Sequence, residues 1–387
     1  MTKTGIFTGT GTKNGRFDAK TGEELLPRQI AFFFLAVLPL TKVIGLPPLL
    51  CAKAENDLWF PYAVYFAADG AMLLFALWCV KRGATFSSLC EAAFGKRGGK
   101  VVILLYAAFF LVKTYIPLGE ERYFVENSLY EAVPRSYFFL PVFLVGAFFA
   151  VRRRAVFGRL MDLLWPVTIA AFAMLLALSF SSAKWEALLP VLYDKTRLFP
   201  AVKAAAFYFG DHLPVLVFAG RFRIKKGDGG RILGGFAFAA AVTLFLAVQY
   251  YAVFTVLGKV QEESVLHLAK FTLSRASIGR VDFLAVYGLL LSSAVGLFVP
   301  AFLAADLLSG VLPFRREWIV CTGFVLLAAA NYFTFENFAV LSAFFREKLF
   351  AVALVFQYLL PLFMMTAFLI KSKKRGDAPE KGVKTHA

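Results

Sequence analysis

Apolar residues occur in long, nearly unbroken blocks along this chain, and short polar segments separate one block from the next. A helix of about 20 residues crosses the ~30 Å hydrocarbon core of a membrane, so each block predicts a transmembrane helix. The pattern predicts an all-α membrane protein with ten transmembrane helices, a disordered cytoplasmic tail over 1–27 and a basic cytoplasmic tail over 371–387. The expected spans are 28–50, 58–80, 101–124, 137–151, 160–180, 201–220, 232–257, 282–310, 318–335 and 347–370.

Two of these spans contain glycine, proline and charge near the middle of the membrane. The first runs from Pro39 through Lys42 and Gly45 to Pro48, and the sixth contains Phe209-Gly210-Asp211-His212-Leu213-Pro214. Backbone that leaves the helix in hydrocarbon has unpaired N–H and C=O groups, so it persists only where protein, ligand or water satisfies them. We therefore expect the first and sixth helices to be broken and to form a binding site.

The positions of the two breaks divide the chain into halves of five spans, 28–180 and 201–370. Because five is odd, the second half must cross the membrane in the opposite direction. This arrangement is the 5+5 inverted repeat of many secondary transporters, whose substrate binds near the midplane between the broken helices.

Composition and charge agree with a membrane protein. The 387 residues are 59% hydrophobic and 17% charged, with a net charge of +17. Lysine and arginine gather in both tails and in alternate loops, for example at Lys96, Arg97 and Lys100, which predicts cytoplasmic termini. The net positive charge thus reflects the membrane topology and does not indicate nucleic-acid binding. It also adds some attraction to anionic membrane lipid. The cysteines and histidines lack metal-ligand spacing, no cofactor motif is found, and no catalytic constellation supports an enzyme.

The charges within the membrane are the strongest candidates for function. Lys42 lies about 21 Å along its span from Arg28 at ~1.5 Å per residue, so we expect it to face the interior. It either replaces a coupling cation, holds a substrate carboxylate, forms a structural ion pair or, if the helix starts later, reaches the outer surface. Asp211 either receives a substrate amine or a proton or caps the following half-helix, and His212 is a candidate for titration near neutrality.

Other polar residues complete the expected site. Asp69 and Lys113 are predicted to pair with each other or with Lys42, whereas Asp162 and Asp306 are expected near the membrane interface. Free backbone groups at 41–45 and 209–211 are expected to hold the carboxylate and the amine of a ligand. The candidate ligand-binding residues are Thr41, Lys42, Gly45, Tyr115, Phe209, Gly210, Asp211 and Ser292.

The segment Leu189-Pro190-Val191-Leu192 is followed by Phe207-Tyr208-Phe209-Gly210-Asp211. These two segments resemble the Leu-Pro-x-Leu and Phe-x-Phe-Gly-Glu pattern of the endospore germination permeases, the B subunits of nutrient germinant receptors. Gly158-Arg159-Leu160-Met161-Asp162 and Ile278-Gly279-Arg280-Val281-Asp282 resemble two further family segments. The likeness extends over 28–370, with Asp211 at the position where the family usually has glutamate.

This resemblance implies a fold of the amino acid, polyamine and organocation transporter superfamily in the bacterial cell membrane or spore inner membrane. It further implies a small nutrient ligand such as an amino acid, A and C receptor subunits as partners, and a role in triggering germination. Two alternatives stay open. One is a proton-coupled secondary transporter of amino acids or amines, and the other is a structural membrane protein whose site is empty.

Overall fold

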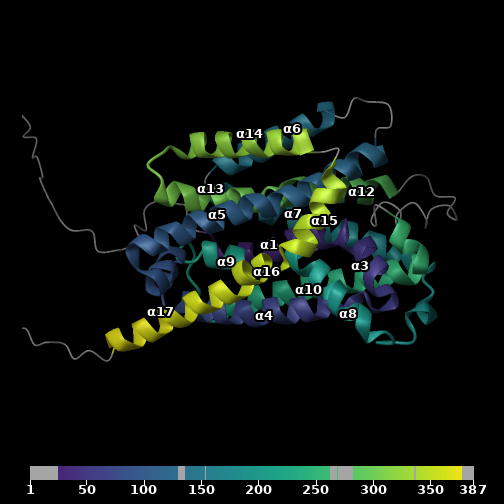
Figure 1. Cartoon of the computed structure of the whole chain (residues 1–387), viewed down its shortest axis with the longest axis horizontal. Helices are drawn as coiled ribbons and strands as arrows, with labels where there is room; N and C mark the ends of the chain where they lie inside the picture. Colours follow the sequence, from purple (N-terminus) through teal and green to yellow (C-terminus); the bar gives the residue numbers. More distant parts are fainter. Residues whose placement is uncertain are drawn as a thin grey trace, which may run out of the picture.

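The computed structural model describes residues 25–129, 136–152, 154–261, 268, 282–334 and 337–376. The regular elements in this part of the chain are all helical, as the sequence predicts. The expected tails fall mostly outside it, at 1–24 and 377–387, and so does most of the connection over 258–280. Figure 1 shows long helices that run side by side along the longest axis of the molecule.

The first half of the chain forms a broken helix followed by four longer ones. The broken helix comprises α1 (Pro27–Val37), α2 (Leu40–Val43) and α3 (Leu46–Ala54), which continues into a 3₁₀ turn (Glu55–Asp57). The four longer helices are α4 (Trp59–Lys81), α5 (Phe86–Leu129), α6 (Ser136–Val151) and α7 (Arg154–Phe180).

The second half begins with another interrupted helix. A 3₁₀ turn (Trp185–Leu188) leads to α8 (Lys195–Ala205), a 3₁₀ turn (Ala206–Tyr208) and the short α9 (Leu213–Val217). The remaining elements are α10 (Asp228–Phe254), a 3₁₀ segment (Thr255–Val260), α12 (Asp282–Leu297), α13 (Val299–Val311), α14 (Arg316–Thr334), α15 (Phe338–Lys348), α16 (Phe350–Leu354), a π-helical turn (Val355–Leu359) and α17 (Leu360–Gly376).

The long helices coincide with most of the expected spans. Seven helices in the described residues are long and apolar enough to cross a membrane, and the bent pair Pro27–Val43 and Leu46–Asp57 would make an eighth. The fourth expected span corresponds to α6, which has 16 residues, and the sixth corresponds to the interrupted α8 and α9. The protein is an integral multi-pass membrane protein, although these helices do not by themselves establish ten spans.

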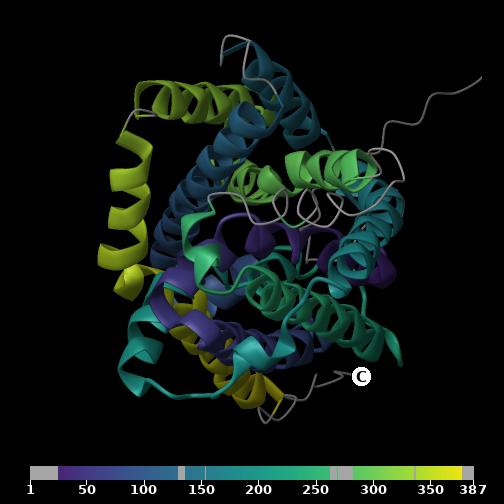
Figure 2. The ribbon, with the colours of Figure 1, turned by 90° about the vertical axis from the view of Figure 1, so that its right-hand side faces the viewer.

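The broken first helix lies at the centre of the bundle. In the end-on view of Figure 2 its purple ribbon is surrounded by the other helices. Aromatic side chains pack around it: Phe34 contacts Phe236 of α10 edge-on at 5.4 Å, and Phe33 contacts Phe157 of α7 at 6.1 Å. This packing buries a large apolar area on both sides of α1 and fixes the position of the break that follows.

The sequence pattern does not predict the helix α15. It joins α14 to α16 and runs along the edge of the bundle at the left of Figure 2. Because α15 has only 11 residues and precedes the last span directly, its apolar positions merge with that span in the sequence. Its basic end, with Arg346, reaches the candidate site.

Candidate functional site

The first break lies between α1 and α3, where the chain bends by 52°. Lys42 is fully buried there, and its backbone carbonyl accepts a hydrogen bond of 2.7 Å from the Tyr62 hydroxyl. The Thr41 hydroxyl donates to the Leu38 carbonyl at 3.2 Å. Side chains of the protein thus satisfy part of the backbone that the break frees, which lets the break persist in an apolar interior.

The second break lies between α8 and α9, where residues 209–212 leave the helix. Gly210 has φ +92°, a conformation that favours glycine. A Cβ at this position would also lie 2.8 Å from the Gln357 side chain. Both the backbone geometry and the close neighbour therefore require glycine at the second break.

An ion pair joins the two breaks. Lys42 Nζ lies 2.7 Å from Asp211 Oδ1, and the Lys42 side chain is completely buried. The same ammonium lies 5.2 Å from the centre of the Phe209 ring. Asp211 Oδ2 is buried and has no hydrogen-bond partner among the described residues. The ion pair thus uses only one oxygen of this carboxylate.

Asp69 of α4 holds the second break from behind. Its Oδ2 accepts hydrogen bonds from the backbone N–H groups of Gly210 and Asp211, both at 3.0 Å. Its Oδ1 lies 2.8 Å from the Tyr358 hydroxyl and 3.1 Å from His212 Nδ1. The buried Asp69 carboxylate thus satisfies both N–H groups at the second break.

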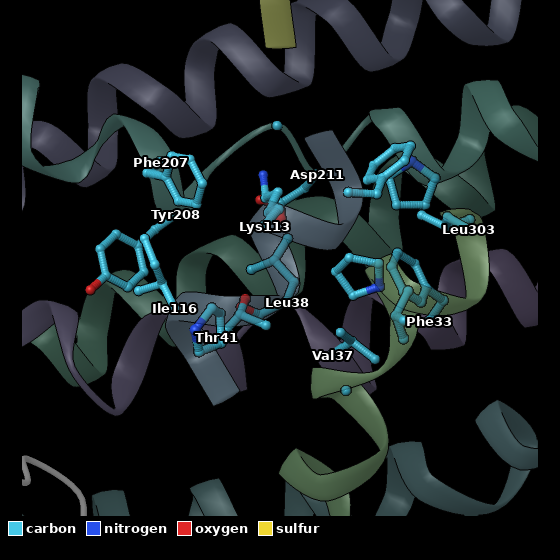
Figure 3. Close-up of a pocket in the computed structure, with 17 residues that line it drawn as sticks. Phe33, Val37, Leu38, Thr41, Lys113, Ile116, Phe207, Tyr208, Asp211 and Leu303 are labelled. Atoms are coloured by element: carbon cyan, nitrogen blue, oxygen red, sulfur yellow. The ribbon is translucent and has the colours of Figure 1, made fainter. Parts of the chain in front are cut away.

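Lys113 of α5 brings a second cation to the site. Its ammonium donates a hydrogen bond to the Phe209 carbonyl at the second break. In Figure 3 its side chain lies next to that of Asp211. The site therefore presents an ammonium group and a carboxylate side by side.

A cavity opens in front of these two groups. The space between its lining atoms is about 690 Å³, with the open mouth included. Figure 3 shows Thr41, Ile116 and Tyr208 on one side of Lys113 and Asp211, and Phe33, Val37 and Leu303 on the other. The lining is otherwise apolar and includes Leu38, Phe110, Pro117, Phe207, Gly210, Pro214, Gly296, Val299 and Pro300.

A third polar cluster adjoins the cavity at Tyr208. The Tyr208 hydroxyl donates a hydrogen bond to Glu120 of α5. Arg346 of α15 donates to the Tyr208 oxygen at 3.1 Å and to Glu120 Oε1 at 3.4 Å. A Cβ at Gly45 would lie 2.6 Å from the Glu120 carboxyl carbon, so glycine leaves room for this carboxylate. The cluster ties both breaks to α15, and we call it the Arg346 cluster.

Five of the eight candidate residues meet at the cavity or directly behind it. Thr41, Gly210 and Asp211 line it, whereas Lys42 and Phe209 support it through the Asp211 carboxylate and the Lys113 ammonium. The other three lie elsewhere. Gly45 contacts Glu120, the Tyr115 hydroxyl bonds Thr334, and Ser292 is buried on α12 outside the cavity lining.

The expected role of the backbone differs from the arrangement found. The N–H groups of Gly210 and Asp211 donate to Asp69, and the carbonyls of Phe209 and Lys42 accept from Lys113 and Tyr62. Because these groups are already hydrogen-bonded, side chains rather than backbone must provide most of the polar ligand contacts.

The remaining charged candidates have structural partners. The Asp211 side chain bonds Lys42 and does not cap α9. Asp306 lies 2.5 Å from Arg154 and 2.9 Å from Arg316. Asp162 accepts a hydrogen bond of 2.8 Å from Gln29. Asp162 and Asp306 thus link helices away from the cavity.

The fold and the two breaks define the class of protein. The fold is similar to that of a solved membrane transporter, and the candidate site lies between the two broken helices. A manganese transporter of Eremococcus coleocola, solved with an aromatic bis-isothiourea substituted compound, has a TM-score of 0.51 and 13% identity, over 89% of this chain and 78% of that chain. A mutant of the same transporter gives 0.49 and 13%, over 92% and 88%.

The family follows from the sequence of the chain. The model of the family described as "Spore germination protein" matches residues 63–339, so the chain belongs to the spore germination protein family. This match confirms the resemblance found in the sequence. Comparison with curated proteins gives no significant match.

Proposed function

We propose that this protein is the permease-like subunit of a spore germinant receptor, and that it binds a small nutrient, an amino acid, and helps to trigger germination. The family and the transporter fold support this role. The observation that carries the proposal is the position of the Lys113 ammonium beside the Asp211 carboxylate, at a largely apolar cavity between two helix breaks.

The chemistry of the cavity matches a zwitterion with an apolar body. The free Asp211 Oδ2 accepts hydrogen bonds from the ammonium of the amino acid, and Lys113 attracts its carboxylate. Charge-assisted hydrogen bonds of this kind contribute about 1.5–3 kcal/mol each. Phe33, Val37 and Leu303 surround the side chain of the ligand. Because Asp69 already fills the N–H groups at the second break, Lys113 replaces them as the group that binds the carboxylate.

The ligand signals by favouring one of two arrangements of the bundle. Both termini are cytoplasmic in this proposal, so that α15 and the Arg346 cluster lie on the outer side, from which the nutrient enters. A ligand shifts the equilibrium only by the difference of its affinities for the two arrangements. The A and C receptor subunits, in the spore inner membrane, respond to this shift.

Ligand binding by the purified protein tests the proposal. A ligand that binds only the folded state raises its stability by about 2.7 kcal/mol at a hundred times Kd. We expect amino acids, but not sugars, to raise the Tm of the protein in detergent. Lys113→Met and Asp211→Asn should abolish this rise, whereas Lys53→Met should not, because Lys53 pairs with Glu347 at the surface.

The result in spores complements this binding experiment. Deletion of the gene should remove the germination response to the amino acid that raises the Tm. A Tm unaffected by every amino acid, or an unchanged nutrient response of the deletion strain, would contradict the proposal.

A proton-coupled transporter of amino acids or amines is the second candidate. The observation that favours it is the group of titratable residues around the breaks. Lys42, Asp69 and His212 are buried, and Lys113 and Asp211 are partly buried beside them. Uptake of a radiolabelled amino acid into proteoliposomes under a pH gradient distinguishes the two, because a pure sensor gives none. Manganese is an unsuitable cargo for this site, since Lys42 and Lys113 place two ammonium groups there.

A further inference from the structure

We propose that Gly296 determines the size of the ligand side chain that the cavity accepts. The inference rests on the proposed function, because it concerns the apolar end of the same site. Gly296 is buried, lines the cavity and belongs to the last turn of α12. A side chain at this position would contact Val37, the last residue of α1 before the first break.

The cavity has a polar end and an apolar end. Lys113 and Asp211 form the polar end and fix the position of an amino acid through its charged groups (Figure 3). Phe33, Val37 and Leu303 lie together on one side of these charges. Because the charged groups anchor one end of the ligand, the space near Val37 limits the length of its side chain.

Two glycines line the cavity within the described residues, and only one of them can accept a side chain. Gly210 has φ +92° and the Gln357 side chain 2.8 Å from a built Cβ. Gly296 has no such strain: a built Cβ there lies 3.4 Å and 3.9 Å from the two methyl groups of Val37, which is ordinary van der Waals contact. The fold therefore requires glycine at position 210. At position 296 glycine is needed only if the ligand occupies the space beside Val37.

The substitution Gly296→Ala changes the cavity without disturbing the helix. Alanine stabilises a helix relative to glycine, so Gly296→Ala is expected to fold. The added methyl group would fill space beside Val37 and shorten the apolar end of the cavity. A hydrophobic pocket discriminates one methylene group by about 10-fold to 200-fold. Glycine at this position thus leaves room for a larger side chain on the ligand.

Selectivity of Gly296→Ala across a set of amino acids tests the inference. Glycine, alanine, valine, leucine and phenylalanine are titrated against the detergent-purified full chain, and each Kd is obtained from the rise in Tm. We expect the largest amino acid bound by the wild type to lose about tenfold or more in affinity. The smallest one bound should change by less than about twofold.

The chain offers a matched control and a reciprocal variant. Gly288 lies on the same helix, and a built Cβ there contacts Ala171 and Val167 of α7 at 3.5 Å and 3.6 Å, away from the cavity. Gly288→Ala should therefore leave the selectivity unchanged. Val37→Ala enlarges the space that Gly296→Ala reduces, so it should shift selectivity toward larger side chains. The double variant should lie between the two single variants.

Three results would overturn the inference. These are an equal loss for every ligand in Gly296→Ala, the same change in Gly288→Ala, and a shift toward smaller ligands in Val37→Ala. If the wild type binds amino acids and Gly296→Ala keeps the same order of preference, the role of Gly296 is refuted while the proposed function stands. Absence of amino acid binding to the wild type refutes the proposed function itself and this inference with it.

Discussion

Lys42 and Asp211 lie in different halves of the chain, yet Lys42 Nζ is only 2.7 Å from Asp211 Oδ1. Each residue belongs to a segment that interrupts a helix, so the ion pair fastens one break to the other. The Lys42 side chain is completely buried. A buried ion pair adds little net stability compared with apolar residues, but removal of one partner leaves an uncompensated charge.

The first prediction concerns this ion pair. Asp211→Asn and Lys42→Met should each lower the free energy of unfolding by about 3–5 kcal/mol, because each leaves the other charge without its partner. The double variant Lys42→Met with Asp211→Asn should recover most of the loss. Thermal unfolding of the purified protein in detergent measures all three changes.

A second lysine in the broken first helix provides the control. Lys53 lies 3.2 Å from Glu347, and both side chains are partly exposed, so Lys53→Met should cost no more than about 1 kcal/mol. If the double variant is as unstable as the sum of the two single variants, the two charges do not act as a pair.

The second prediction concerns Asp69, which accepts hydrogen bonds from two backbone N–H groups of the second break. Asn keeps one acceptor oxygen but loses the negative charge that strengthens these two hydrogen bonds, and its amide N–H groups then face the Tyr358 hydroxyl and His212 Nδ1. Asp69→Asn should therefore increase amide hydrogen exchange at Gly210 and Asp211. Tyr358→Phe removes only the hydroxyl partner of Asp69 and should cost about 1 kcal/mol with little change in exchange. Unaltered exchange in Asp69→Asn would show that the carboxylate does not hold the break.

The breaks could be predicted because their cause is local. Gly45, Gly210 and the prolines beside them disfavour a continuous helix wherever they lie. Lys42 and Asp211 were predicted within the site for the same reason, since a charge at depth must face the interior. These two segments alone indicate where the site lies.

The partners of the site could not be predicted in the same way. Glu120, Tyr208, Arg346, Gln357 and Tyr358 come from different elements, and their contacts depend on how far each helix is rotated and shifted. Glu120 offered one signal, a carboxylate three residues after Pro117 at the end of an apolar block. Tyr115 and Ser292 show the converse, because residues of suitable chemistry on the same helices lie outside the cavity lining.

The third prediction concerns the Arg346 cluster, which joins α15 to the cavity through Tyr208. Arg346→Gln removes charge-assisted hydrogen bonds worth about 1.5 kcal/mol, which corresponds to about a tenfold change in an equilibrium. In the proposed topology this should open the outer side of the cavity. In a Thr41→Cys variant, the new thiol should then react about tenfold faster with a membrane-impermeant thiol reagent added from outside than it does when Arg346 is present.

The background for this measurement follows from the native cysteines. Cys51, Cys79 and Cys90 are buried and Cys321 is exposed, so Cys321→Ser removes the reactive site. Lys348→Gln changes an exposed cation on the same helix without touching Tyr208, and it should leave the reaction rate unchanged. Equal rates in Arg346→Gln and Lys348→Gln would mean that the cluster does not control access.

The fourth prediction is a dependence on pH at the start of α8, outside the apolar spans. The hydroxyl of Thr196, then its backbone N–H and after these the Arg197 guanidinium, hold the pKa of Asp194 below its ordinary value. Arg197 also lies 2.6 Å from Glu55, so this turn connects α8 to the end of the first broken helix. Because the pKa is lowered in the folded state, the charge of Asp194 stabilises the fold fully above the unfolded pKa of about 3.9. This contribution declines as pH falls below that value and is lost once pH passes the lower folded-state pKa.

Asp194→Asn isolates the charge, because asparagine also caps helix N-termini well. The Tm of this variant should therefore lie below that of the wild type at pH 7, and the difference should shrink toward pH 3. Thermal unfolding of both proteins across this range measures the difference. A difference that stays constant from pH 7 to pH 3 would mean that the cap stabilises α8 by its hydrogen-bonding shape alone. In that case the link between α8 and the first broken helix would not depend on the charge of Asp194.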